Sequence, residues 1–315
     1  MKKLIAFLII LFIISAIAIG INLLNRYVQY DFEKSKPDGL NVETRVAFLK
    51  DGNNIIFNAR IDGKEQIFKF NLETQKTQQL TCTGANMAPD VSPSNNRTVF
   101  ISDRNGSKEL YVMDESGAGQ RRLTNNKTEE FPPSFCPDGS KIVFQRVSKN
   151  HSKREIIVLN MGDFTENQIM AYDYTRYYQD PVFLDNNTVR FESVGWVCLI
   201  DVSQKKEISR TEKIEPSYYP IFSRDKKKVA FDDFVNEYYT EGSGGGVYEV
   251  FIADSNGNRR IRITNNKNCS RPRTFTPDGQ HVVFISGAPK DWGNLALWQV
   301  DINGKNAKQF NINLK

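Results

Sequence analysis

The sequence predicts an all-β fold, namely a six-bladed β-propeller of four-stranded antiparallel blades, preceded by one N-terminal hydrophobic helix. Three observations predict it. One strand-and-turn pattern occurs six times between residues 45 and 310, each copy contains four strand-like segments, and an apolar run lies ahead of the copies. A lone copy cannot bury both faces of its sheet, so the copies must stack. A solenoid is the structural alternative, but ring closure removes the exposed edges of an open stack.

The first segment, residues 1–26, is expected to be a membrane signal-anchor. Residues 4–24 are a 21-residue apolar run that follows two lysines, long enough to span a bilayer as a helix. A cleaved signal peptide is the alternative, with Ala16-Ile17-Ala18 as a weak cleavage site. The N-terminal lysines place the N-terminus in the cytoplasm by the positive-inside rule. Residues 27–44 are then a polar tether, and the chain beyond it lies outside the inner membrane.

Six aligned windows define the repeat. They are residues 48–57, 91–100, 135–144, 183–191, 222–231 and 275–284. Each window reads aromatic or Val, a turn, an apolar pair and a closing Phe. The turn contains Asp-Gly three times and Asp-Asn once, which suits the positive φ of a tight hairpin, so each window is two strands joined by a turn. We expect the closing Phe to point into the core, and the proline that precedes five of the windows to begin a strand.

A third strand follows each window and ends in Asp or Asn in all six copies. A polar turn and a fourth strand come next, and the fourth strand ends in Leu-Thr or Ile-Thr in three copies. The closing Phe recurs at steps of 40 to 53 residues, the length of a four-stranded blade. Within a propeller of residues 45–315, the predicted blades are about 45–82, 88–125, 132–171, 180–212, 219–265 and 272–311.

Two segments carry a resemblance to a known family. PPSFCPDGSKIVF (132–144) and LYVMDESGAGQRRLT (110–124) resemble the WD40-like repeat of TolB-type propellers, and the resemblance covers residues 45–310, weakest in the fourth copy. It implies a six-bladed protein-binding platform in the bacterial cell envelope, periplasmic or on the outer surface. Only about twenty residues separate the apolar run from the first copy. We therefore expect the N-terminal α/β domain of TolB itself to be lacking, and the Tol-Pal partners are not carried over.

One face of the predicted propeller collects the long insertions. The second-to-third loops and the connections between blades share that face, and they include residues 149–154, 171–180, 232–249 and 288–294. Nine of the twelve tyrosines also fall there, Tyr248 among them. Tyr and Trp are enriched at binding hot spots, although about half of these rings could instead fill the central channel. The candidate partner-binding residues are Tyr172, Tyr174, Tyr177, Tyr178, Tyr218, Tyr219, Tyr238, Tyr239 and Trp292.

Charge and cysteine usage exclude other classes of protein. The net charge of +5 falls to +2 without the three cations of residues 1–26, and no concentrated basic face suits nucleic acid. The four cysteines lack metal-type spacing and are expected to be isolated thiols, with a bridge between Cys82 and Cys269 as the alternative. The acidic residues of 232–241 are expected to form a solvated hairpin rather than a cation site. No cofactor and no metal are predicted.

Catalysis is not predicted. Only two histidines are present, His151 and His281, and no Gly-x-Ser-x-Gly motif accompanies them. The sequence therefore predicts a non-catalytic scaffold that binds an envelope protein or a cell-wall polymer through its tyrosine-rich face, with the membrane reached through residues 4–24. A carbohydrate-active enzyme, of glycoside hydrolase or lyase type, is the alternative. Its carboxylate pair would come from Asp173, Asp180, Asp232, Asp233, Glu237 and Glu241.

Overall fold

The computed structural model describes residues 37–314, except 42, 127, 148–152, 174–179, 194–195, 213–219, 236–246, 256 and 289–294. Contacts divide the chain into two units, Met1–Asp38 and Gly39–Lys315, and all strands belong to the second unit. The predicted apolar helix and most of the predicted tether lie outside the described residues. Among the residues that are described, no helix is long and apolar enough to cross a membrane.

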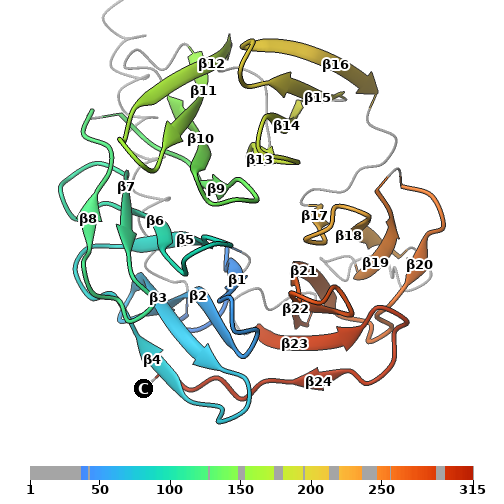
Figure 1. Ribbon diagram of the computed structural model, residues 1–315. Helices are drawn as coiled ribbons and strands as arrows, with labels where there is room; N and C mark the ends of the chain where they lie inside the picture. Colours follow the sequence, from blue (N-terminus) through green and yellow to red (C-terminus); the bar gives the residue numbers. More distant parts are fainter. Residues whose placement is uncertain are drawn as a thin grey trace, which may run out of the picture. The chain divides into compact units, whose positions relative to one another are not determined.

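The first sixteen strands form four antiparallel sheets of four consecutive strands each (Figure 1). The first sheet contains β1 (Val46–Phe48), β2 (Asn54–Ile61), β3 (Lys64–Asn71) and β4 (Thr77–Gln79). The second contains β5 (Asn86–Val91), β6 (Thr98–Ser102), β7 (Glu109–Met113) and β8 (Arg121–Arg122). The third contains β9 (Ser134–Phe135), β10 (Lys141–Val147), β11 (Lys153–Asn160) and β12 (Glu166–Asp173). The fourth contains β13 (Val182–Phe183), β14 (Thr188–Ser193), β15 (Trp196–Asp201) and β16 (Lys206–Glu212).

The last eight strands form one larger sheet that consists of two groups of four consecutive strands. The fifth group contains β17 (Ile221–Phe222), β18 (Lys228–Phe234), β19 (Tyr248–Asp254) and β20 (Ile261–Arg262). The sixth group contains β21 (Cys269–Phe275), β22 (His281–Gly287), β23 (Ala296–Asp301) and β24 (Lys308–Gln309). A single parallel pair, Tyr248 with Cys269, joins the two groups. The predicted all-β class and the four-stranded antiparallel sheets are confirmed.

The first strand of each group lies innermost, and the fourth strand lies on the outside (Figure 1). Contacts run from β1 to β5, from β5 to β9 and from β9 to β13, and also from β17 to β21 and from β21 back to β1. Groups that begin and end the described chain therefore lie side by side. This arrangement brings residues from distant parts of the sequence to one central space.

The closing Phe of every predicted window is buried, with an exposed fraction of at most 7%. Its partner on the third strand is aromatic in four groups, so the two rings stack across the sheet. The stacked pairs are Phe57 with Phe68, Phe100 with Tyr111, Phe231 with Phe251 and Phe284 with Trp298, at centroid distances of 5.6 to 6.4 Å. Such cross-strand aromatic pairs stabilise a sheet beyond the area they bury.

The Asp and Asn residues of the repeat shape its turns. Gly52, Gly139 and Gly279 adopt φ values of 73°, 73° and 66° after their aspartates, as a tight hairpin requires. At the end of the third strand, the side chain of Asn71 accepts a hydrogen bond from the N–H of Thr74 at 2.8 Å. Equivalent bonds follow Asp114, Asn160, Asp201 and Asp254. The recurring residue is therefore a turn former, because its oxygen satisfies backbone donors that the strand leaves open.

Buried apolar clusters seal the contacts between neighbouring groups. Separate clusters join the first group to the second, the second to the third, the third to the fourth, the fifth to the sixth and the sixth to the first. The cluster around Phe231 contains only residues of the fifth group among those described. Where the fourth and fifth groups meet, the guanidinium of Arg190 instead lies 5.3 Å from the ring centre of Phe222. Arg190 occupies the position before the closing Phe, which is apolar in the other five copies.

The sixth and first groups meet without a shared strand, because each group is made of consecutive strands. Leu40 pairs with Leu295 in an isolated bridge, and Phe310 packs on Phe70 with ring centres 5.8 Å apart. Both contacts belong to the apolar cluster that joins these groups. Side-chain packing therefore carries this junction.

Several predicted details are wrong. Pro89 and Pro272 lie inside β5 and β21, next to register shifts, rather than at strand starts. A bulge frees a proline from the ladder bond that it cannot donate. The insertions predicted at 149–154, 171–180 and 232–249 are shorter, because β11, β12, β18 and β19 extend into them. Since Asp232 is 2% exposed, it does not belong to a solvated hairpin.

All four cysteines are free thiols, as predicted, and the alternative bridge between Cys82 and Cys269 is not formed. Cys198 is a buried residue of β15, which the sequence also indicated.

Candidate functional site

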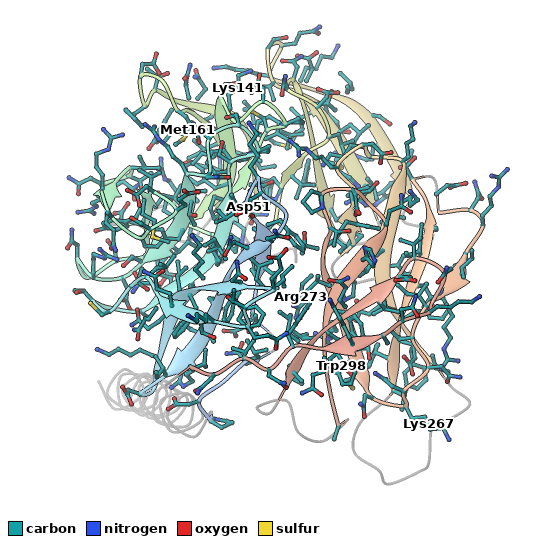
Figure 2. All side chains as sticks on the ribbon, turned by 60° about the horizontal axis from the view of Figure 1, so that its bottom comes forward. Asp51, Lys141, Met161, Lys267, Arg273 and Trp298 are labelled. Carbon is teal, nitrogen blue, oxygen red and sulfur yellow. The ribbon has the colours of Figure 1, made fainter. Side chains whose placement is uncertain are left out.

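The first strands enclose a central cavity of about 650 Å³. Seven prolines and several apolar side chains form much of its wall. Its charged lining residues come from all six groups and the loops between their strands; they are Glu43, Arg45, Lys50, Asp90, Lys108, Glu130, Asp180, Arg224, Lys226 and Arg273. Arg273 of β21 is labelled in Figure 2. A cavity that gathers titratable groups from distant segments is the first place to look for a binding site.

An ion pair connects opposite parts of this cavity. Arg45 lies just before β1, and its Nη2 binds the Oδ2 of Asp180, just before β13. The backbone N–H of Arg45 donates to Asn58 at 2.8 Å, which fixes where the arginine leaves the chain. Burial raises the pKa of Asp180, and the charge of Arg45 opposes that rise. The first and fourth groups are thereby tied to each other by side chains that line the cavity.

A second pair of charges faces the cavity from the second and fifth groups. Asp90 of β5 accepts a hydrogen bond from the backbone N–H of Phe135 at 2.7 Å. Burial raises the pKa of Asp90, although this bond and nearby cations oppose the shift. Burial also lowers the pKa of Lys226, and the attraction of Asp90 works against that change. Each charged form is therefore less favourable than it would be in water.

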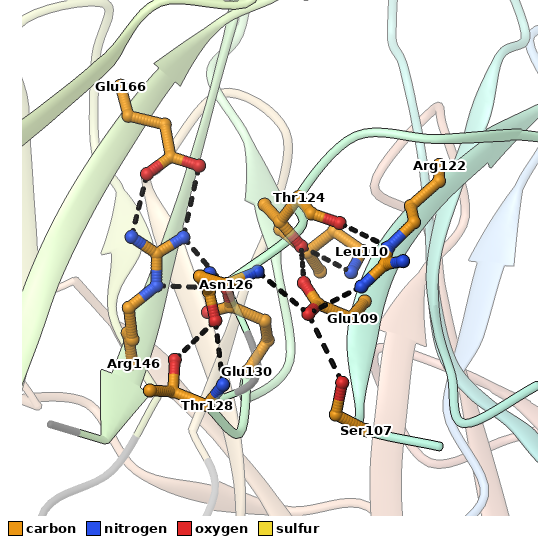
Figure 3. Close-up of polar contacts among 10 residues, drawn as sticks. All are labelled: Ser107, Glu109, Leu110, Arg122, Thr124, Asn126, Thr128, Glu130, Arg146 and Glu166. Atoms are coloured by element: carbon orange, nitrogen blue, oxygen red, sulfur yellow. Dashed lines mark hydrogen bonds and ion pairs between the residues drawn. The ribbon is translucent and has the colours of Figure 1, made fainter. Parts of the chain in front are cut away.

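Two buried glutamates lie close together between the second and third groups (Figure 3). Glu109 begins β7 and is fully buried. Its carboxylate accepts hydrogen bonds from Thr124 at 2.5 Å, from Arg122 at 2.8 Å and from the backbone N–H of Asn126 at 3.0 Å. Thr124 also accepts the N–H of Leu110 at 2.9 Å. Glu109 is thus well satisfied, which is what a buried carboxylate requires.

The second glutamate, Glu130, precedes β9 and is 1% exposed. Its Oε1 accepts hydrogen bonds from Asn126 at 2.6 Å and from Arg146 at 2.8 and 2.9 Å (Figure 3). Burial raises the pKa of Glu130 to about 7, because desolvation outweighs the bonds from Arg146 and Asn126. Burial opposes the charge of Arg146, yet its bonds to Glu166 and Glu130 raise the pKa of the guanidinium. Asn126 therefore contacts both glutamates.

The Glu109 network has a counterpart between the fifth and sixth groups. Glu249 accepts hydrogen bonds from Thr264, from Arg262 at 3.3 Å and from the N–H of Asn266 at 3.0 Å. Between the first and second groups a neutral version exists, in which Gln66 accepts from Thr81 at 2.8 Å and Gln79 donates to the carbonyl of Thr81. The sequence analysis noted the recurring threonine but missed its partner. The available signal is a Glu or Gln fifteen residues before each threonine.

The structure describes only a small part of the predicted binding face. Tyr172 of β12 stacks its ring on Phe191 at 5.9 Å and so takes part in packing between the third and fourth groups. Tyr248, on β19, lies edge-on to Phe234, and the guanidinium of Arg271 is 5.7 Å from its ring centre. The other candidates lie outside the described residues: Tyr174, Tyr177, Tyr178, Tyr218, Tyr219, Tyr238, Tyr239 and Trp292.

Three of the six candidate catalytic carboxylates can be placed, and each faces an arginine. Asp180 binds Arg45, Asp233 binds Arg260, and Asp232 lies 3.5 Å from the Nε of Arg271. Burial raises the pKa of Asp232. The side chains of Asp173, Glu237 and Glu241 lie outside the described residues. The described members therefore do not form a pair of facing carboxylates.

Metal-binding chemistry was considered from the same side chains. In the part of the chain that the structure describes, no group of three or more His, Cys, Asp or Glu residues could hold a metal ion. His281 of β22 has its Nε2 3.3 Å from Asp301, and His151 is outside the described residues.

Comparisons with known proteins agree with this architecture. A family model described as the TolB beta propeller domain matches residues 70–193. The Tol-Pal system protein TolB of Francisella tularensis subsp. tularensis (strain WY96-3418) is 30% identical over 229 residues, covering 71% of this chain and 50% of that protein. A protein TolB homolog of Chlorobium chlorochromatii is 24% identical over 188 residues, covering 60% and 30%. The matches thus span half or less of these relatives.

Solved structures share the fold at low identity. An oligogalacturonate lyase of Vibrio parahaemolyticus has a TM-score of 0.59 at 12% identity, covering 85% of this chain and 91% of that one. A puromycin hydrolase S511A mutant has a TM-score of 0.54 at 9% identity, covering 89% and 54%. At such identities the likeness concerns the fold alone.

Proposed function

Because the chain belongs to the TolB-type β-propeller family, we propose that its six groups of strands close into a six-bladed ring that serves as a non-catalytic binding scaffold. The ring would work outside the cytoplasm, in the bacterial cell envelope, with residues 4–24 as its membrane anchor. Its partner would be an envelope protein or a cell-wall polymer. The curated relatives support an envelope partner, since they are proteins of the Tol-Pal system.

The contacts between groups support six-bladed closure. In a ring of six, the first and fourth blades are opposite each other, as are the second and fifth. Arg45 and Asp180 join the first opposite pair of groups, and Asp90 and Lys226 face the cavity from the second. The sixth group also shares an apolar cluster with the first. These are the neighbours and opposites that a closed ring of six would produce.

The observation that carries a binding role over catalysis is the pairing of the candidate carboxylates with arginines. A glycosidase needs two carboxyl groups that face each other about 5 to 9.5 Å apart across a cleft. Asp180, Asp232 and Asp233 each face a guanidinium instead. This neutralises the charge that would have to act as base or nucleophile, so we favour the scaffold over the carbohydrate-active alternative.

The strand order supports the tyrosine-rich loops as the binding face. The segments between β12 and β13, β16 and β17, β18 and β19, and β22 and β23 leave and enter their strands at the same end of the groups. These segments carry the eight candidate residues that the structure leaves undescribed. Loops on a rigid sheet scaffold are a common place for recognition.

The test is affinity capture from detergent-solubilised membranes. Replacing Tyr177, Tyr178, Tyr238 and Tyr239 by Ala is expected to remove the captured partner while thermal unfolding stays as in the wild type. The matched control replaces exposed Lys227 and Lys305, which lie in turns at the opposite end of the strands, and is expected to capture normally. Equal capture by the tyrosine variant and the control would reject this face.

A further inference from the structure

We propose that the central cavity binds a primary ammonium group at Glu130, supplied by a lysine side chain or by the N-terminus of another chain. This inference does not depend on the tyrosine-rich loops, because every residue that carries it belongs to the described cavity wall and its supporting network.

The proposal starts from an unsatisfied carboxylate oxygen. Glu130 lines the cavity and is 1% exposed. Arg146 and Asn126 donate to its Oε1, whereas its Oε2 has no hydrogen-bond partner among the described residues. A buried acceptor without a donor costs on the order of 1 to 3 kcal/mol, and more when charged. A ligand that donates to Oε2 from the cavity would offset that cost.

The repeat itself shows that the fold does not need this glutamate. The sequence TNNK occurs at residues 124–127 and again at 264–267, after equivalent strands. Six residues after the threonine, the first copy has Glu130 and the second has Ser270. Opposite them in their sheets lie Arg146 and Ser286. Ser270 and Ser286 satisfy each other at 3.0 Å. A charged pair where two serines suffice points to a role other than folding.

The charges around the cavity favour a cationic ligand at this end. Glu43, Glu130 and Asp180 lie at or before the starts of first strands, where the cations of the lining are Arg45 and Lys108. Arg45 is already paired with Asp180. At the opposite end, the turns after β1 and β17 contribute only cations to the lining, namely Lys50, Arg224 and Lys226. An ammonium group entering the cavity is therefore attracted to the Glu130 end and repelled from the other.

The chemistry of the site suits an ammonium ion better than a metal ion. A divalent cation such as calcium needs six to eight oxygen ligands, and Glu130 offers one free carboxylate oxygen. An ammonium group has three donors and forms a short, charge-assisted bond with a single carboxylate oxygen. The apolar and proline-rich wall can accommodate the alkyl stem of a lysine.

The ionisation of Glu130 makes the binding measurable. The titratable or charged groups nearest to it are Arg146, which binds it, Glu166 on the other side of that guanidinium, Glu109, and Lys108, whose carbonyl accepts the N–H of Glu130. With the pKa of Glu130 raised to about 7 by burial, about a tenth of the carboxyl is ionised at pH 6 and about nine tenths at pH 8. An ammonium ligand binds the ionised form.

The experiment is calorimetric titration of the full chain with Nα-acetyl-lysine methylamide and, in parallel, with glycinamide. Nα-acetyl-norleucine methylamide, which has the same stem without the charge, is the control ligand. The lysine derivative or glycinamide is expected to bind about tenfold more tightly at pH 8 than at pH 6, in step with the ionised fraction. Whichever binds more tightly identifies a side-chain or a terminal ammonium as the source.

Two variants isolate the site. Glu130→Gln is expected to weaken binding of the amine at least tenfold, about 1.4 kcal/mol. The double variant Glu130→Ser with Arg146→Ser reproduces the pair at Ser270 and Ser286, so it is expected to fold and to lose binding. Glu73→Gln, which changes an exposed acid, should bind as the wild type does. The proposal is overturned if the norleucine derivative binds as tightly as both amines, or if folded Glu130→Gln keeps the wild-type affinity.

Discussion

The guanidinium of Arg45 binds the carboxylate of Asp180 across the central cavity, although 135 residues separate them. The contact joins the first and fourth groups of strands, which share no sheet. Because each partner is held just before an innermost strand, the pair responds to the placement of whole groups rather than to local structure. It is therefore a sensitive reporter of the assembled fold.

Breaking this pair is expected to destabilise the protein. Arg45→Met leaves a buried carboxylate without its cation and should lower the free energy of unfolding by about 1 to 3 kcal/mol in urea titrations. Adding Asp180→Asn should recover part of that loss, because the uncompensated charge is gone. As a comparison, Arg210→Met removes an exposed pair with Glu207 and should cost under about 1 kcal/mol. A double variant no more stable than Arg45→Met would contradict the charge argument.

The pH dependence of stability should include a contribution from Glu130. Its pKa in the folded state is about 7, above the ordinary 4.5. The folded protein thus holds this proton more tightly, so the contribution is fully present below pH 4.5 and is lost as the pH rises through 7. The 2.5-unit difference sets an upper limit of about 3 kcal/mol.

We expect Glu130→Gln to show a flatter profile of unfolding free energy between pH 4.5 and 7 than the wild type. Urea titrations at several pH values measure it, with Glu73→Gln as an exposed control that keeps the wild-type slope. Parallel profiles for the wild type and Glu130→Gln would show that this carboxyl does not titrate in that range.

The Glu109 network should tolerate conversion to its neutral counterpart better than partial change. Glu109→Gln alone, or Arg122→Gln alone, leaves one charge without its partner and should cost about 1 to 3 kcal/mol. The double variant reproduces Gln66 and Gln79, which already serve between the first and second groups. Denaturant titrations of all four proteins give a double-mutant cycle. Simple additivity of the two single losses would argue against the equivalence of these networks.

Gly139 should be less replaceable than Gly279, although both follow an aspartate in the same turn and have similar φ values. A Cβ at Gly139 would lie 2.4 Å from the Oγ atoms of Ser92 and Ser94, whereas a Cβ at Gly279 meets nothing within 4 Å. Alanine should cost both sites a backbone penalty, and Gly139→Ala should cost about 1 kcal/mol more because the serines must move. Thermal unfolding measures this difference, and equal losses would mean that the serines rotate away freely.

The repeat could be predicted from the sequence because its signals are local. The buried Phe, the turn aspartates and the residue after the third strand each act within one hairpin, so alternation and turn chemistry reveal them. Arg190 could also have been noticed, since it interrupts an apolar pair that the other copies keep. That interruption marks the junction at which the described contacts include a cation on Phe222.

The cavity chemistry could not be predicted in the same way. Glu130 follows another glutamate in a polar stretch that reads as a solvated loop, and its burial depends on packing between two groups of strands. The pairing of Arg45 with Asp180 depends on how those groups are arranged, which no local pattern specifies. The prolines in β5 and β21 failed as strand starts because bulges allow a proline inside a strand.

The two kinds of junction between groups should respond to different conditions. Apolar packing joins the sixth group to the first, and such packing weakens on cooling while simple salts change it little. Between the fourth and fifth groups, the described contact involves the charged Arg190, which dissolved ions can screen. Cold should therefore loosen the protein where its ends meet, and salt should loosen it at the other side.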